Sequence, residues 1–224
     1  RIKKDGVTSN PVGGEEYLKK IKPDLTSSVA RHLMLESELM VNTRITAKAA
    51  GDLIAIKVIS PEGAYDTFEI VTGEEKELRV GQIIIGALGV RFAERAICGR
   101  VPQEGVAAGD IIEILSVGGI LGESTKINYG LKPPRKVEVI GIVISPHHSD
   151  VPLNLREAGI PWLTHLEKSP PLVLVVGTSM DAGKTTTAAH IISGFSDRGY
   201  RVAAIKFTGT SRMKDLGVFD KIGK

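Results

Sequence analysis

The chain of 224 residues has a single cysteine, and aromatic residues make up only 4% of it. One cysteine excludes an internal disulfide framework and favours a reducing compartment, so we expect a cytoplasmic protein. Cys98 itself lies between Ile97 and Gly99 in a run typical of a strand, where it is expected to be a small core residue. The scarcity of aromatic rings leaves little surface for stacking on nucleobases.

Long hydrophobic runs and an excess of one charge are also missing. No apolar run approaches the roughly 18 residues of a membrane span, and no signal-peptide pattern opens the sequence. The 29 basic and 26 acidic residues give a formal net charge of +3, and these charges are dispersed. Membrane insertion is therefore not predicted. Nucleic-acid binding is the least favoured of three hypotheses for the function, and it would require strongly salt-dependent binding.

What the sequence does contain is a glycine loop that joins a strand pattern to a helix pattern. Val173–Val176 is typical of a short buried strand. The loop is Gly177-Thr178-Ser179-Met180-Asp181-Ala182-Gly183, and Lys184-Thr185-Thr186 opens the helical pattern. This order is that of a phosphate-binding loop, whose backbone N–H groups surround an anion. The helix N-terminus adds about half a positive charge.

The residue types assign roles within this loop. Its backbone from Gly177 to Thr186 would hold the phosphates of ATP or GTP, Lys184 would reach the terminal phosphates, and Thr185 would ligate Mg²⁺. The strict pattern G-x-x-x-x-G-K-[ST] would place its first glycine at Thr178, whereas the glycine here comes one residue earlier. The alternative is a glycine-rich turn followed by an incidental Lys-Thr pair.

The loop with five residues between its glycines resembles that of dethiobiotin synthetase. It is similar, more loosely, to those of cobyrinate a,c-diamide synthase and of the P-loop accessory proteins of molybdopterin-guanine-dinucleotide synthesis. In dethiobiotin synthetase a second lysine ends the next strand, a hydroxyl residue follows four positions later, and both face the substrate. Here those positions are Lys206 and Thr210. The resemblance covers about residues 172–211. Ser179 and Phe207 depart from the family's acid and proline, so dethiobiotin synthesis itself is not predicted.

Together the loop and the resemblance predict an enzyme that depends on ATP and Mg²⁺. It would activate a carboxylate or similar group of an unknown small-molecule acceptor by phosphoryl transfer, with Lys184 and Lys206 as catalytic residues and Thr210 facing the substrate. The alternative is a nucleotide-dependent switch, or an accessory NTPase of cofactor assembly, whose β-rich part binds a partner. The resemblance also implies a homodimer.

The fold class expected from these patterns is an α/β P-loop nucleotide-binding domain with a parallel sheet, preceded by a small all-β barrel-like domain. Only fourteen residues follow Thr210, so we expect the parallel sheet to be incomplete and the chain to be a fragment. The expected segments are an N-terminal arm and helix over 1–41, the barrel-like domain over 42–131, a connector with a strand and a short helix over 132–171, and the start of the P-loop domain over 172–224.

Within the barrel-like domain a short pattern repeats. Ala49-Ala50-Gly51-Asp52 resembles Ala107-Ala108-Gly109-Asp110, and Arg79-Val80-Gly81-Gln82 is a weaker third copy. Each copy predicts a tight turn that leads into a strand, with the glycine at positive φ and the aspartate bonded to its own backbone. A binding module is the other interpretation of the repeat.

Four residues also suggest a metal site: His147, His148, Asp150 and His165. Adjacent histidines on an extended loop point in different directions and seldom ligate one ion without further ligands. The default interpretation is a polar loop near the nucleotide.

Overall fold

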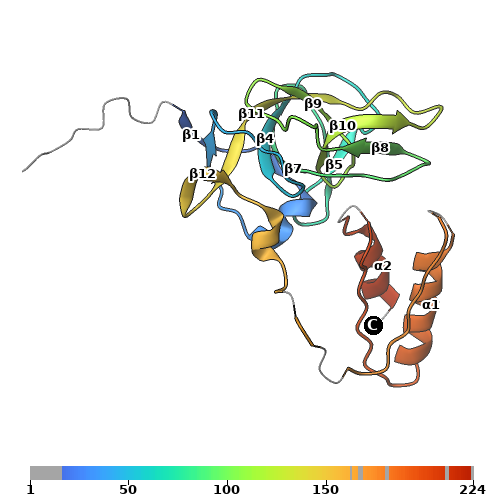
Figure 1. Cartoon of the computed structure of the whole chain (residues 1–224). Helices are drawn as coiled ribbons and strands as arrows, with labels where there is room; N and C mark the ends of the chain where they lie inside the picture. Colours follow the sequence, from blue (N-terminus) through green and yellow to red (C-terminus); the bar gives the residue numbers. More distant parts are fainter. Residues whose placement is uncertain (1–16, 162, 166–168, 180–181, 210–211, 223–224) are drawn as a thin grey trace, which may run out of the picture.

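The computed structural model describes residues 17–161, 163–165, 169–179, 182–209 and 212–222. The two C-terminal α-helices pack against each other and lie below the strand-rich part in the view of Figure 1. No helix within these ranges is long and apolar enough to cross a bilayer. The strands are β1 (Leu18–Ile21), β2 (Leu25–Thr26), β3 (Leu39–Asn42), β4 (Leu53–Val58), β5 (Thr67–Glu69), β6 (Glu75–Glu77), β7 (Ile83–Leu88), β8 (Ile97–Arg100), β9 (Ile111–Ile114), β10 (Ile120–Ile127), β11 (Lys136–Ser145) and β12 (His148–Pro152). The helices are the 3₁₀ turns η1 (Ser28–Leu33) and η2 (Leu155–Ala158) and the α-helices α1 (Lys184–Ser196) and α2 (Lys214–Ile222).

Five of the strands form a closed ring. β11 pairs with β4, β4 with β7, β7 with β10, β10 with β9, and β9 with β11 again. The β7–β10 pairing is parallel, and the other four are antiparallel. β3 and β1 extend the sheet outward from β11, and β8 extends it from β10. We call the five strands β4, β7, β9, β10 and β11 the ring. β5 and β6 form a separate hairpin.

Alternate side chains of the ring strands belong to two cores. Ile54 and Ile56 of β4 pack with buried residues from β7, β9, β10 and β11, so they fill the interior of the ring. Leu53 and Ala55 point to the opposite face, where they pack with residues of η1 and β3 and with Leu153. The alternation follows from the two-residue period of a strand. Because both faces of β4 are covered, its sequence is an almost continuous apolar run.

The three copies of the repeat form equivalent turns. Gly51 and Gly109 both have φ of 95°, and Gly81 has φ of 89°. In each turn a side-chain oxygen accepts from the backbone N–H three residues earlier: Ala49 N to Asp52 Oδ2 at 2.9 Å, Arg79 N to Gln82 Oε1 at 2.7 Å and Ala107 N to Asp110 Oδ2 at 2.8 Å. The prediction for these turns is confirmed. They lead into β4, β7 and β9, so the repeat starts three of the five ring strands.

The expected α/β fold class is wrong. The structure is mostly β, with 34% strand and 15% helix, and its main sheet is a mixed sheet of ten strands rather than the parallel sheet of a P-loop domain. The stretch 173–176, expected as a strand, contains no strand, and neither does 200–207, the next strand, which Lys206 was expected to end. Val173 and Leu174 are 61% and 75% exposed. An apolar run becomes a strand only where neighbouring strands accept its hydrogen bonds and cover its faces, and these stretches have no such cover.

The helix expected within 1–41 is replaced by strands and a 3₁₀ turn. Leu25–Thr26 pairs in parallel with β7, and Leu39–Asn42 pairs with β1 and β11. Only Ser28–Leu33 between them is helical, as 3₁₀. Partners distant in sequence therefore decide the structure here against a local apolar spacing that resembles a helix.

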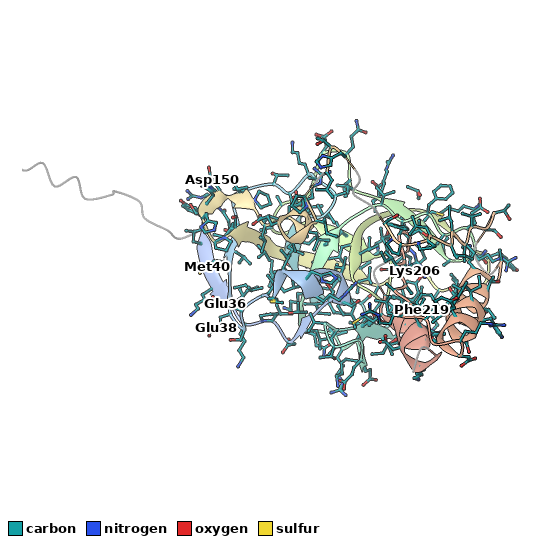
Figure 2. The ribbon with its side chains drawn as sticks, turned by 90° about the horizontal axis from the view of Figure 1, so that it is seen from below. Glu36, Glu38, Met40, Asp150, Lys206 and Phe219 are labelled. Carbon is teal, nitrogen blue, oxygen red and sulfur yellow. The ribbon has the colours of Figure 1, made fainter. Side chains whose placement is uncertain are left out.

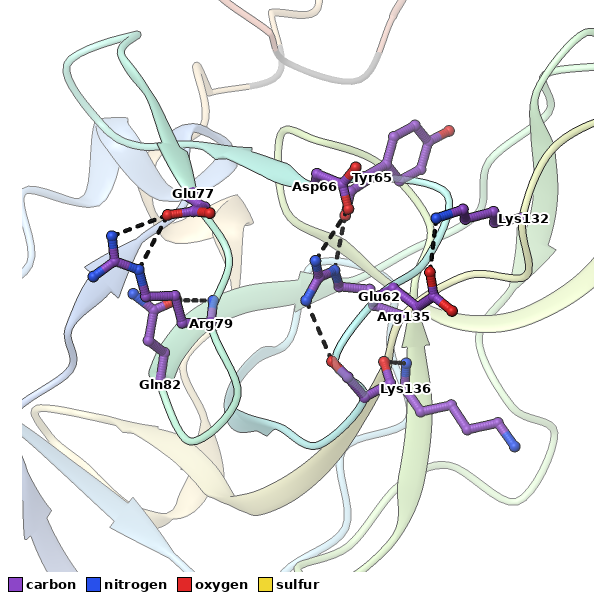
Figure 3. Close-up of polar contacts among 10 residues, drawn as sticks. Glu62, Tyr65, Asp66, Glu77, Arg79, Gln82, Lys132, Arg135 and Lys136 are labelled. Carbon is purple, nitrogen blue, oxygen red and sulfur yellow. Dashed lines mark hydrogen bonds and ion pairs between the residues drawn. The ribbon is translucent and has the colours of Figure 1, made fainter.

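The stretch 132–135, which opens the expected connector, contacts the loop between β4 and β5. Arg135 is 4% exposed. Its guanidinium donates to the carbonyls of Tyr65 and Ser60 at 3.0 and 3.2 Å and to Asp66 Oδ1 at 3.1 Å (Figure 3). The next ten residues are β11, which pairs with β3, β4 and β9. The strand expected within 132–171 thus completes the ring.

Candidate functional site

The glycine loop ends where α1 begins. Gly183 is the residue before the helix and has φ of 80°, a left-handed conformation that a residue with a Cβ adopts only with strain. Its carbonyl accepts the first helical hydrogen bond, from Thr187 N at 2.9 Å. Gly183, as a glycine, has no side chain that could cap the helix, and the first backbone N–H groups of α1 follow it at the end of the loop. This is the backbone arrangement that favours an anion.

Lys184, the first residue of α1, folds back over the loop. Its Nζ donates to the carbonyl oxygen of Ser179 at 2.5 Å. The aliphatic part of the side chain passes close to Gly177, where an added Cβ would lie 2.9 Å from Cγ and 3.1 Å from Cδ of Lys184. The absence of a side chain at Gly177 therefore makes room for the lysine. The two loop glycines serve different purposes, since one turns the backbone and the other admits the lysine.

A second lysine lies near the first. The pKa of Lys206 is lowered from its ordinary value, mainly by burial among protein atoms and next by the positive charge of Lys184. The residue as a whole remains exposed, so partial burial of its ammonium group is the cause. Gly209, with φ of 137°, allows close approach here, because a Cβ on it would lie 3.1 Å from Cε of Lys206. Figure 2 shows Lys206 at the end of the molecule that carries Phe219 of α2, away from Asp150 and Met40.

The structure thus brings together the start of α1, Lys184 and Lys206. Thr185 lies in the first turn of α1 and is half-buried, and the exposed Thr186 accepts a hydrogen bond at its carbonyl from Nδ1 of His190 at 2.8 Å. Three predicted site residues, Met180, Asp181 and Thr210, lie outside the described residues. Two ammonium groups and the amide end of a helix concentrate positive charge, and such a site attracts a multiply charged anion.

The suggested metal site is not assembled. Within the described ranges, which include His147, His148, Asp150 and His165, no group of three or more His, Cys, Asp or Glu side chains is placed to hold a metal ion. His148 and Asp150 belong to β12, the edge strand paired with β11.

Two residues of the C-terminal segment that follows Lys206 were not singled out from the sequence. Arg212 and Met213, just before α2, contact Glu69 of the β5–β6 hairpin. Met213 and Glu69 are 144 residues apart in the chain. The only local signal is an acidic residue in a strand, which is ordinary on a solvent-facing edge, so nothing in the sequence connects them.

Comparison with known proteins adds no relative. No protein-family model, no curated protein and no solved structure matches this chain. The functional argument therefore rests on the residues around the start of α1.

Proposed function

We propose that the start of α1, together with Lys184 and Lys206, binds the phosphates of a nucleoside triphosphate with Mg²⁺. The protein would then be an ATP-dependent enzyme that activates a carboxylate or similar group by phosphoryl transfer. The observation that carries the proposal is the position of Lys184, whose ammonium group reaches back across a loop bounded by Gly177 and Gly183. An incidental lysine at a helix start would be free to extend into solvent.

The residues present fit this ligand. The backbone N–H groups at the start of α1 supply donors, and the space at Gly177 admits the lysine side chain. Lys184 would neutralise charge on the terminal phosphates. The hydroxyl of Thr185 is the hard oxygen ligand that Mg²⁺ prefers, and the metal would neutralise the triphosphate. Lys206 would hold the anionic acceptor close to the phosphate. An anion between the two lysines would stabilise the charged form of Lys206, which the charge of Lys184 otherwise disfavours.

The test is calorimetric titration of Mg-ATP and Mg-GTP into the protein and into Lys184→Ala. We expect the wild-type protein to bind Mg-ATP, and the variant to lose at least tenfold in affinity, because a charge-assisted contact to phosphate contributes roughly 1.5–3 kcal/mol. Lys57→Ala is the matched control, since Lys57 is an exposed lysine on β4. It should bind as the wild type does.

Three outcomes bear on the proposal. Absence of binding by the wild-type protein would overturn it, as would equal affinity in Lys184→Ala. Binding that prefers GTP would favour the nucleotide-dependent switch over the ATP-dependent enzyme. Binding of ATP without transfer of phosphate to any carboxylate would leave the phosphate site standing and remove the enzymatic part.

A further inference from the structure

The C-terminal helices are joined to the strand-rich part at the β5–β6 hairpin. The backbone N–H of Met213 donates to Oε1 of Glu69 at 2.9 Å, and Nε of Arg212 lies 3.6 Å from Glu69 Oε2. Arg212 also pairs with Glu75 on β6. At the turn between the two strands, a Cβ on Gly73 would lie 3.2 Å from Sδ of Met213. The hairpin therefore contacts the residues just before α2 through both charge and shape.

Glu69 differs from the other acidic residues of this hairpin because it is buried. Its side chain is 2% exposed, whereas that of Arg212 is 29% exposed. A carboxylate taken out of water needs hydrogen bonds and an opposite charge to offset the loss of hydration. Arg212 and Met213 supply both, and they are consecutive residues of the C-terminal segment.

The same contact sets the start of α2. The carbonyl of Met213 accepts the first hydrogen bond of that helix, from Gly217 N at 2.9 Å, while its N–H is bound by Glu69. Glu69 thus supplies from a distant strand the carboxylate that helix N-termini favour. α2 packs against α1, the helix that begins with Lys184. Only five residues separate Lys206 from Arg212, so fixing Arg212 restricts how far from it Lys206 can lie.

We propose that Glu69 is a positioning residue for the phosphate site: by holding Arg212 and Met213 it fixes the segment that presents Lys206 beside Lys184. This inference rests on the proposed function. Binding of a triphosphate between the two lysines and docking of residues 212–213 on the hairpin then stabilise each other. By reciprocity, docking strengthens phosphate binding by the same factor by which bound phosphate strengthens docking, so a variant that loosens the hairpin contact should bind phosphate less tightly.

The experiment measures affinity for Mg-ATP, with sodium tripolyphosphate as a second probe that lacks the base. In Glu69→Gln the amide oxygen can still accept from Met213 N–H, but the buried charge that faces Arg212 is gone and Arg212 keeps only its pair with Glu75. We expect Kd to rise about fivefold or more in Glu69→Gln and in Arg212→Gln. The Kd of the double variant should be no higher than that of the single variant with the higher Kd, because both changes remove one shared contact.

Glu77→Gln is the matched control. Glu77 lies on β6 of the same hairpin, and its ion pair with Arg79 joins side chains that are 68% and 73% exposed. The substitution removes the same charge from the same hairpin without touching the C-terminal segment, so Kd should stay within twofold of the wild-type value, an effect of about 0.4 kcal/mol.

Hydrogen exchange on the wild-type protein keeps the test independent of how the variants fold. Tripolyphosphate should slow amide exchange at residues 212–216 and 67–77 together. Wild-type binding with unchanged affinity in Glu69→Gln, or protection confined to the glycine loop, would overturn the positioning role while the phosphate site stands. Failure of the wild-type protein to bind either probe would overturn the proposed function and this inference with it.

Discussion

At the scale of single residues, the lowered pKa of Lys206 makes the free energy of unfolding depend on pH. The pKa of Lys206 is lowered from 10.5 by burial and by Lys184, so folding disfavours its charged form. Between the lowered pKa and 10.5 the unfolded chain holds a proton here that the folded protein has released. The free energy of unfolding therefore rises with pH through that window, and the destabilising contribution is fully present below it.

Removing Lys184 should raise the pKa of Lys206 without restoring it to 10.5. Burial is the larger cause of the lowered pKa, and Lys184→Ala removes only the repulsion. Titration of the lysine side-chain signals by NMR measures both values, with Lys57→Ala as the control that leaves Lys206 unchanged. An unchanged pKa in Lys184→Ala would show that the two ammonium groups are too far apart to share a site.

At the scale of elements, the starts of three ring strands were predictable, whereas the helix expected within 1–41 was wrong. The glycine in each of the three turns requires positive φ, and the adjacent side chain closes the turn by bonding three residues back, so both signals are local. The helix α1 was also predictable, because Lys184-Thr185-Thr186, which opens the helical pattern, directly follows the loop that ends at Gly183. β2 and β3 depend instead on pairing with β7, β1 and β11, which no local pattern encodes.

The turn at Gly109 provides a test of this reading. Gly109 and Gly51 share φ of 95°, but a Cβ on Gly109 meets nothing within 4 Å, whereas one on Gly51 lies 2.8 Å from Asn154 Oδ1. Gly109→Ala should lower the free energy of unfolding by about 1–2 kcal/mol from backbone strain alone. Gly51→Ala should cost more, because Asn154 donates to Asp52 Oδ1 at 2.8 Å and cannot move without losing that bond.

Urea denaturation of the two alanine variants and of Gly109→Asn measures these differences. Asparagine tolerates positive φ better than alanine, so Gly109→Asn should be the mildest of the three. Equal stability of Gly109→Ala and the wild-type protein would contradict the strain argument.

At the scale of the whole molecule, the sequence located the candidate site but gave the wrong architecture around it. The Gly-x₅-Gly-Lys-Thr spacing identified the loop and Lys184 because all its parts are contiguous. The apolar runs at 173–176 and 200–207 suggested a parallel sheet, and they are mostly exposed and without strand structure. Closure of the ring by β11 and the contact of Arg212 with Glu69 link residues far apart in the chain. Such contacts arise from topology, which periodicity does not report.

One measurement directly tests the central claim that Lys184 and Lys206 share a phosphate site. We would record the NMR signals of the lysine side chains while titrating Mg-ATP into the protein. The signals of Lys184 and Lys206 should move together with one Kd, and the pKa of Lys206 should rise because bound phosphate favours the charged ammonium. If nucleotide binds while both signals stay fixed, or if no lysine responds at all, the start of α1 is not the phosphate site.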